Sequence, residues 1–336
     1  MSDDVVTLAH GAGGKASRRL VEELFLDELR NPLLEPLADA AIVSANGTRL
    51  AFTTDSYVVR PLFFPGGDIG ELAVNGTVND LAVSGAVPLA LTAGFVIEEG
   101  FPIDELRAIA HSAARAAKAA GVSIVAGDTK VVERGAADGL YLTTAGIGIL
   151  DSRVGLDPSC VRPGDRVLVS GGIAEHGIAV MIARGNLALE LDVDSDTAPL
   201  HELAQALCAL GPGLRWMRDP TRGGLATTLN ELAWGAGASV VLDERAIPVR
   251  EDVRAACELL GIDPLYVANE GKLVAVVAPD AAEAALAALR AHPLGAGAAL
   301  IGEVREDDLP LVLADTGFGG SRIVDMLVGD PLPRIC

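Results

Sequence analysis

The stretch "DELRAIAHSAARAAKAAGVSIVAGDTKVV", residues 104–132, joins a helical pattern directly to a strand-like run. Apolar side chains recur in and just before it at helical spacing: Ile103, Leu106, Ala110, Ala113 and Ala117. This spacing predicts an amphipathic helix, and Gly121 is a typical residue for its C-terminal end. The apolar run that follows Gly121 predicts a β-strand.

Strand-like and helix-like runs alternate on both sides of this stretch. From about residue 40 to 150 the strand-like runs also include "LAFTTDSYVV", "PLALTAGFVI" and "LYLTTAGIGIL". A second series begins at "RVLVSGGIAEHGIAVMIARG" and continues through "DAAEAALAALRA". The turn-rich "LDPSCVRPGD" separates them, which predicts a domain boundary near residues 155–165. The alternation predicts an α/β or α+β class and leaves the strand order open.

Composition and charge exclude several classes of protein. The 336 residues are 50% apolar, enough for a sizeable core, and carry a formal net charge of −20. A nucleic-acid or anionic-membrane surface needs a basic patch, so neither partner is expected. The start "MSDDVVTLAH" lacks the pattern of a signal peptide, and no 18-residue apolar run follows, so a cytoplasmic protein is expected. Four widely spaced cysteines predict neither a disulfide framework nor a structural zinc site.

Glycines precede a helical pattern near the start of the chain. The segment "HGAGGKASRRL", residues 10–20, could direct backbone N–H groups at a phosphate. It is not a Walker A loop, because Ala9 occupies the position of the first required glycine. Considered alone, a flexible glycine turn is the favoured interpretation.

Short polar side chains at two places in the first half suit a hard divalent cation or a phosphate. Asp55 lies at the end of the strand-like "AFTTD", where a turn-capping role is the alternative. Asn75, Asn79 and Asp80 lie on successive turns of a predicted helix, where a solvated helix face is equally compatible with the pattern.

A carboxylate and an ammonium group occur together in "IVAGDTKVV". Lys130 could neutralise charge that develops in phosphoryl transfer, while Asp128 holds Mg²⁺. A surface ion pair is the alternative. In the second half, "RDPTRGG" sets Asp219, Thr221 and Arg222 ahead of a helix.

The second half also contains "ANEGKL", in which Asn269, Glu270 and Gly271 precede a strand. Each of these motifs could be only a tight turn. Summed over an acidic chain without a Walker A loop, they indicate Mg²⁺–nucleotide chemistry on another scaffold. The chain ends "DPLPRIC", where Pro331 and Pro333 are expected to keep an extended tail and Arg334 lies beside Cys336. Arg334 could lower the pKa of the thiol or simply solvate the tail.

Seven motifs, in order along nearly the whole chain, resemble those of the HypE family of carbamoyl dehydratases, which act in NiFe hydrogenase maturation. They are "HGAGGKAS", "TTDSYVV", "NGTVNDLAVSGA", "GDTKVV", "DPTRGGLATTLNELA", "ANEGKL" and the terminal "PRIC". These proteins are similar to the superfamily of aminoimidazole ribonucleotide synthetase, selenophosphate synthetase and thiamine-monophosphate kinase.

The resemblance implies a two-domain aminoimidazole ribonucleotide synthetase-like fold. Residues 1–40 would form a glycine-rich segment and helix, and residues 41–155 an α/β domain that dimerises through its sheet and binds ATP with Mg²⁺. Residues 160–310 would form an α+β domain that closes the cleft, and residues 315–336 a flexible tail that ends in the reactive cysteine.

The resemblance further implies a reaction on this tail. A HypF-type carbamoyltransferase would carbamoylate the thiol of Cys336, and ATP would phosphorylate the carbamoyl oxygen. Loss of phosphate would leave a thiocyanate, and cyanide would pass to iron on a HypC–HypD complex. The base that removes the N–H proton is left open.

By the same resemblance Asp55, Asp80 and Asp128 would hold Mg²⁺, and Lys130 and Asp80 would act with Cys336 in catalysis. The ATP site would comprise Gly11, Gly13, Gly14, Asp55, Asn79, Asp128, Lys130, Asp219 and Glu270.

Three alternatives compete with this hypothesis. A small-molecule kinase or synthetase of the same superfamily would treat the tail as incidental, and a scaffold would only display it. A selenophosphate synthetase is disfavoured, because such enzymes usually carry a reactive cysteine or selenocysteine near the glycine segment, whereas the first cysteine here is Cys160. His176, beside a predicted helix, is interpreted as a packing or capping residue.

Overall fold

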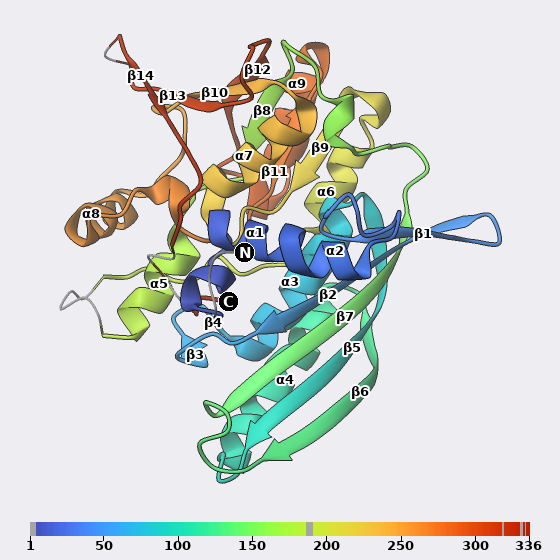
Figure 1. The fold of residues 1–336 in the computed structure, drawn as a ribbon, viewed down its shortest axis with the longest axis vertical. Helices are drawn as coiled ribbons and strands as arrows, with labels where there is room; N and C mark the ends of the chain where they lie inside the picture. Colours follow the sequence, from blue (N-terminus) through green and yellow to red (C-terminus); the bar gives the residue numbers. More distant parts are fainter. Residues whose placement is uncertain (1–4, 186–190, 318, 330–331, 333) are drawn as a thin grey trace.

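Two mixed β-sheets, one in each half of the chain, form the framework of the molecule (Figure 1). The computed structural model describes residues 5–185, 191–317, 319–329, 332 and 334–336. Pro331 and Pro333, which were expected to extend the tail, lie outside the described residues. The predicted two-domain α/β and α+β fold is confirmed.

The N-terminal sheet has the strand order β1-β2-β7-β5-β6. Its neighbours are antiparallel except for β5 and β6, which are parallel and joined by helix α4. Two parallel strands need a long crossover connection, usually a helix. Helix α4 and strand β6 are the helix-to-strand unit expected from residues 104–132. The strands are β1 (Ala41–Ala45), β2 (Thr48–Tyr57), β5 (Ala86–Glu98), β6 (Ser123–Val132) and β7 (Leu140–Leu150), and a small hairpin pairs β3 (Phe63–Phe64) with β4 (Gly67–Asp68).

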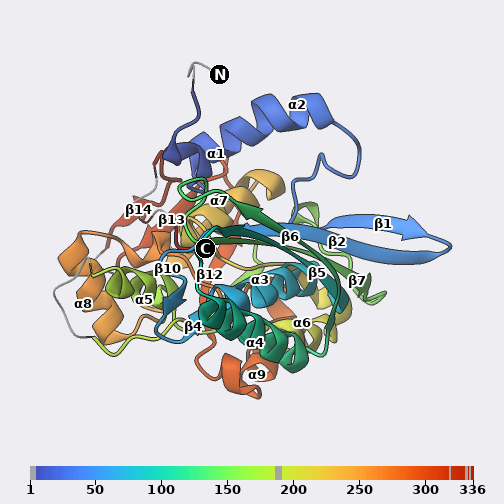
Figure 2. The same cartoon turned by 90° about the horizontal axis from the view of Figure 1, so that it is seen from below.

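Helices α3 (Ile69–Val83) and α4 (Ile103–Ala119) lie on the same side of this sheet (Figure 2). Asp68 caps α3, since its Oδ1 accepts hydrogen bonds from the backbone N–H groups of Gly70 and Glu71. Nearly every residue of α3 is buried, because the second domain packs against the side that faces away from the sheet. The polar residues of α3 therefore lie inside the molecule and not on a solvated face.

The C-terminal sheet is covered on both faces, and strand β11, which lies between β8 and β9, shows why. In β11, Val274 and Val276 pack with α7, whereas Ala275 and Val277 pack with α6 and α9, because side chains alternate across a strand. The strand order is β14-β13-β10-β12-β8-β11-β9. The strands are β8 (Arg166–Val169), β9 (Leu214–Arg218), β10 (Ser239–Asp243), β11 (Val274–Val277), β12 (Ala299–Arg305), β13 (Val312–Asp315) and β14 (Ser321–Ile323); the helices are α5 (Glu175–Ala183), α6 (His201–Cys208), α7 (Gly224–Ala236), α8 (Glu251–Leu260) and α9 (Ala282–Arg290).

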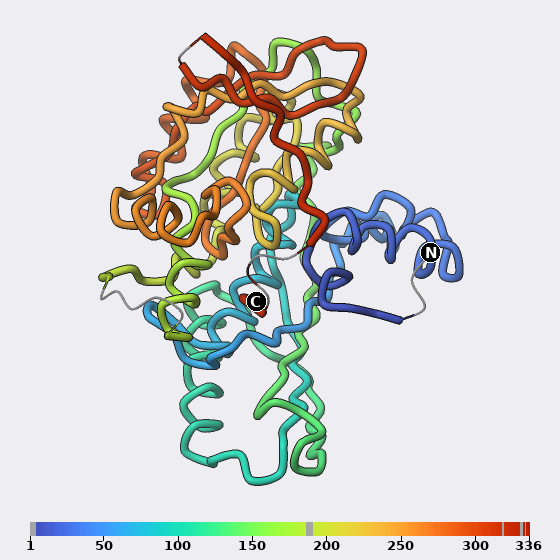
Figure 3. The backbone as a smooth tube through the Cα atoms, turned by 60° about the vertical axis from the view of Figure 1, so that its left-hand side comes forward, coloured from blue at the N-terminus to red at the C-terminus, as the bar shows by residue number. Residues whose placement is uncertain are grey.

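Both ends of the described chain return to the junction of the two domains. Helices α1 (Lys15–Leu20) and α2 (Leu26–Leu29) continue one another through the π-helical turn Val21–Phe25. After β14 the chain runs back toward the N-terminal domain and ends between the domains, as Figure 3 shows. No helix among the described residues is long and apolar enough to cross a membrane.

Candidate active site at the domain junction

A cavity of about 370 Å³ lies beside strand β2, between the two domains. Within the described chain β1 pairs with β2 only as far as Phe52, so the segment Thr53–Tyr57 presents a free edge to the second domain. Helix α3, the turn between β9 and α7, and the end of the chain close the cavity. It is lined by Gly13, Asp39, Thr53, Thr54, Asp55, Ser56, Tyr57, Gly76, Asp80, Arg218, Asp219, Thr221, Arg222, Thr227, Thr228, Glu231, Glu270 and Cys336.

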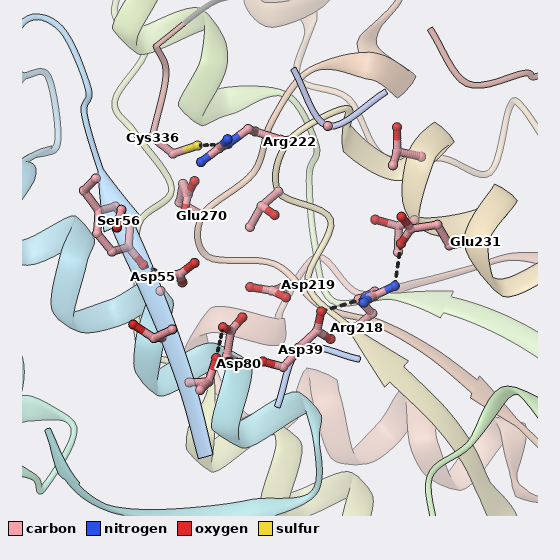
Figure 4. Close-up of a pocket in the computed structure, with 18 residues that line it drawn as sticks. Asp39, Asp55, Ser56, Asp80, Arg218, Asp219, Arg222, Glu231, Glu270 and Cys336 are labelled. Carbon is pink, nitrogen blue, oxygen red and sulfur yellow. Dashed lines mark hydrogen bonds and ion pairs between the residues drawn. The ribbon is translucent and has the colours of Figure 1, made fainter. Parts of the chain in front are cut away.

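Acidic side chains dominate one end of this cavity (Figure 4). Asp39, Asp80 and Asp219 each offer a carboxylate oxygen, and these atoms all lie within 4.8 Å of one another. The Thr53 hydroxyl donates to Asp80 Oδ2 at 2.7 Å, and the Tyr57 hydroxyl donates to Asp55 Oδ2 at 3.0 Å. Carboxylate oxygens brought together from separate elements form the donor set that a hard divalent cation prefers.

Burial is the main electrostatic feature of the cluster. It raises the pKa of Asp80 well above its ordinary value, and the nearby charges of Asp55 and Asp219 raise it further. Burial likewise raises the pKa values of Asp219, Glu270 and Asp55. One oxygen of Glu270, Oε1, is buried and has no hydrogen-bond partner among the described residues.

The two arginines beside the cluster, Arg218 and Arg222, already form hydrogen bonds with other groups. Arg218 donates through Nε to Asp39 Oδ1 at 2.7 Å and pairs also with Glu231. Arg222 donates to the sulfur of Cys336 and to the backbone oxygen of Gly11, each at 2.9 Å. The carboxylates are therefore under-neutralised, and this property, together with the free Glu270 oxygen, fits a bound divalent cation.

The end of the chain is part of the site. Cys336 is only 7% exposed, and its backbone oxygen accepts from Val58 N at 3.2 Å, while the Arg334 oxygen accepts from Arg60 N at 3.2 Å. The tail thus pairs with the segment that directly follows β2. This differs from the expected loose tail, because backbone pairing and burial of Ile335 and Cys336 fix its last residues.

The cation beside the thiol is Arg222 and not Arg334. Arg334 turns away and pairs with Asp138 at 2.6 Å, and it also donates to the Val58 oxygen. Burial raises the pKa of the Cys336 thiol to about 11, and the charge of Arg222 opposes that rise only in part. The seated sulfur is accordingly held as a thiol at neutral pH.

The N-terminal glycine segment closes over Arg222. A Cβ atom on Gly13, whose φ is +76°, would lie 2.7 Å from Arg222 Cβ, and one on Gly14 would lie 2.1 Å from the Leu327 oxygen. Lys15 N donates to the Leu327 oxygen at 2.8 Å. Glycines at these two positions therefore allow the segment to pack closely on both Arg222 and the returning chain.

Five of the residues expected in the ATP site do not line this cavity: Gly11, Gly14, Asn79, Asp128 and Lys130. Asp128 and Lys130 form an exposed ion pair at 2.7 Å in the middle of β6, since that strand continues to Val132 instead of ending at Asp128. Hydrogen bonding from Lys130 lowers the pKa of Asp128. Asn79 joins the domains: its Nδ2 donates to the backbone oxygens of Ala198 and Glu270, and its Oδ1 accepts from Leu200 N.

Two other lining residues were not singled out in the sequence. Asp39 lies just before β1 and outside any motif, and Arg218, the last residue of β9, is the first residue of "RDPTRGG". Neither was selected from the sequence, because their role arises from contacts across about 180 positions of chain. Arg222 was noticed within "RDPTRGG", but nothing in that motif indicates the terminal cysteine as its partner.

Known proteins share this architecture. The AIR synthase related protein family matches twice, through its N-terminal domain at residues 37–150 and its C-terminal domain at residues 162–312. The fold and the junctional acidic cavity thus define an AIR synthase related protein of two domains. More narrowly, the carbamoyl dehydratase HypE of Rhizobium leguminosarum bv. viciae is 55% identical over 332 residues, covering 98% of this chain and 95% of that protein.

Solved structures agree with this assignment. The crystal structure of a HypE–HypF complex superposes with a TM-score of 0.87 at 49% identity and covers 92% of this chain and 99% of that one. A HypE structure in complex with ATP gives a TM-score of 0.83 at 47% identity over 99% of this chain and 100% of that one. The chain belongs to the HypE family of carbamoyl dehydratases, the hydrogenase maturation branch of the AIR synthase related proteins.

The buried carboxylates predict an unusual dependence of stability on pH. A carboxyl group whose pKa is raised in the folded state contributes stability that is fully present below its unfolded value, 3.8 for Asp80, and lost as pH rises through the folded value. In EDTA, Asp80→Asn should therefore raise the melting temperature at pH 8 by on the order of a few degrees, with little gain at pH 4.

The control is Asp128→Asn, because the pKa of Asp128 is lowered and removal of its charge should not stabilise the protein. Thermal melts at both pH values, with and without Mg²⁺, provide the measurement. A wild-type protein that is more stable than Asp80→Asn at pH 8 in EDTA would contradict the account of the cluster.

Proposed function

We propose that the chain is an ATP-dependent carbamoyl dehydratase whose substrate is its own carbamoylated Cys336. The observation that carries this proposal is the position of the Cys336 sulfur, inside the acidic cavity and 2.9 Å from Arg222 Nε. A terminal thiol that only displayed a group to partners would gain nothing from burial among carboxylates. A substrate sulfur needs this position, because the group it carries must reach the phosphate donor.

The reaction balances as the loss of water from the thiocarboxamide, with ATP hydrolysed to ADP and phosphate. The carbamoyl oxygen attacks the γ-phosphorus, ADP leaves and one N–H proton is released; a base then takes the remaining N–H proton as the C–N triple bond forms and the C–O bond to phosphate breaks. Phosphorylation is required because an amide oxygen is a poor leaving group. Arg222 holds the sulfur, so that the carbamoyl group extends into the cavity.

Mg²⁺ would be held by carboxylates of the cavity. Asp80 and Asp55 are the implied ligands within it, and Asp39 and Asp219 add two further oxygen donors. When bound, the ion supplies charge neutralisation for the phosphates of ATP. The remaining ATP contacts are assigned to Gly11, Gly13 and Gly14, with Asp219 and Glu270 from the second domain.

The tail must also meet two partners outside the cavity. We infer that a HypF-type carbamoyltransferase loads the thiol and that a HypC–HypD complex accepts cyanide at its iron. The crystallised relative in complex with HypF supports the first partner. The Cys336 thiol is buried in the cavity, so both exchanges require the last residues to leave the segment that follows β2.

A homodimer would complete the site. Asp128 pairs in register with Gly94 and Lys130 with Val96, while the alternating residues Ala93 and Ile97 are buried beneath the sheet. Asp128 and Lys130 therefore lie on the opposite face, which also exposes the apolar Phe52, Val87 and Ile149. Pairing two such faces would bury this apolar surface and could bring Lys130 of one subunit to the cavity of the other.

The substrate assignment is tested by the mass of the C-terminal peptide. Protein carbamoylated on Cys336 and given ATP with Mg²⁺ should lose the mass of one water from that peptide, whereas Cys336→Ser should acquire no carbamoyl group. An unchanged mass of the carbamoylated peptide, with ATP hydrolysed or not, would overturn the proposed reaction.

The dimer is tested by complementation between inactive subunits. Lys130→Ala should slow dehydration by at least on the order of 100-fold, and Cys336→Ala should abolish it. If Lys130 acts across the interface, a mixture refolded or co-expressed from the two variants should regain product on the tail of the Lys130→Ala subunit. Equal inactivity of the mixed dimer and of each parent would place Lys130 in its own subunit's site or outside the reaction.

A further inference from the structure

A histidine that does not line the cavity contacts the backbone of Ile335, the residue before the reactive cysteine. His176, the second residue of α5, is completely buried. Its Nε2 lies 2.9 Å from the backbone oxygen of Ile335, and its Nδ1 lies 2.8 Å from Ser195 Oγ. The ring of Phe64 packs against it edge-on, with 5.5 Å between the centroids. Because these contacts enclose the imidazole ring, its hydrogen bond holds the Ile335 carbonyl in a single position.

The hydrogen-bond partners assign the proton on the ring. A carbonyl oxygen only accepts, so Nε2 carries the hydrogen that it donates to Ile335. Burial lowers the pKa of His176, so the ring is neutral and Nδ1 accepts the hydrogen of Ser195 Oγ. Ser195 Oγ in turn accepts from Thr197 N at 3.1 Å. Donors and acceptors along this chain are therefore matched in a single tautomer.

The segment that fixes His176 also supports the acidic cavity. Ser195 N donates to the Pro65 oxygen at 2.8 Å, which anchors the segment on the N-terminal domain. The next residue, Asp196, accepts from Glu270 N and from Lys272 Nζ, each at 3.0 Å. The tail and the Glu270 loop are thus held by adjacent residues of one segment.

We propose that His176, oriented by Ser195, is a positioning residue that seats the C-terminal tail with its sulfur at Arg222. The proposal builds on the proposed function, in which dehydration requires the seated tail and carbamoylation requires the released tail. Loss of His176 should accordingly affect the two steps in opposite directions. A residue needed only for folding would impair both.

Thiol alkylation tests whether His176 holds the tail in the cavity, and this test does not depend on the enzymatic reaction. Purified protein is treated with iodoacetamide, and the peptide containing Cys336 is quantified by mass over time. His176→Leu should raise the alkylation rate of Cys336 on the order of tenfold, since it removes one hydrogen bond to a buried carbonyl. His176→Gln, which can still donate to Ile335, should stay within about threefold of the wild type. His111→Leu, on the exposed face of α4, should not change the rate.

Cys208 and Cys257 report on folding in the same samples, because both are buried. If His176→Leu exposes them, Ser195→Ala decides instead, and it should raise the Cys336 rate several-fold. Alkylation of Cys336 at the wild-type rate in the folded variant would overturn the proposal.

The enzymatic reaction distinguishes a failure of the proposed function from a failure of the positioning role of His176. In a single turnover, His176→Leu should slow dehydration on the order of tenfold while carbamoylation by the partner enzyme becomes faster. If the wild-type protein does not dehydrate its carbamoylated Cys336, the proposed function is contradicted. The alkylation result then remains the test of whether His176 positions the tail. If His176→Leu dehydrates the carbamoylated tail at the same rate as the wild type, the positioning role is contradicted.

Discussion

Buried and half-buried carboxylates that lack enough positive charge are the constraint on which the rest of the site depends. Asp55 and Asp80 come from the N-terminal domain, and Asp219 and Glu270 come from the C-terminal domain. Ionised carboxylates inside a protein are costly unless they are paired or bind a metal. Arg218 and Arg222 reduce this cost but are shared with Asp39, Glu231 and Cys336. The cluster is thus arranged to receive a cation, and with it a phosphate group, between the domains.

The end of the chain completes this arrangement. Strand β2 leaves an open edge next to the cluster. The last residues pair with the segment just after β2, through backbone hydrogen bonds from Val58 and Arg60. Arg222 then connects the terminal sulfur to the glycine segment that closes the cavity. The terminal sulfur and the glycine segment therefore meet at Arg222, beside the carboxylates of the cavity.

Much of the fold could be predicted from the sequence, because residues 104–132 and their neighbours carry clear helix and strand periods. Five residues that line the cavity were selected from short sequence motifs: Asp55, Asp80, Asp219, Glu270 and Cys336. Asp80 lies within helix α3, and the other four lie near a turn, a strand end or the chain end. Asp39 and Arg218 were missed because only the packing of the two sheets brings them together. Helix α3 is buried on all sides, so its sequence has no polar face to indicate which of its residues reach the cavity.

The central claim is that one buried pocket holds both the divalent cation and the chain's own terminal cysteine. It is tested most directly by replacing Mg²⁺ with paramagnetic Mn²⁺ and recording the NMR signals of protein labelled with ¹³C in its four cysteines. The account predicts strong, selective broadening of the Cys336 signal, which Asp80→Asn should weaken. A Cys336 signal that Mn²⁺ leaves as sharp as those of Cys160, Cys208 and Cys257 would contradict it.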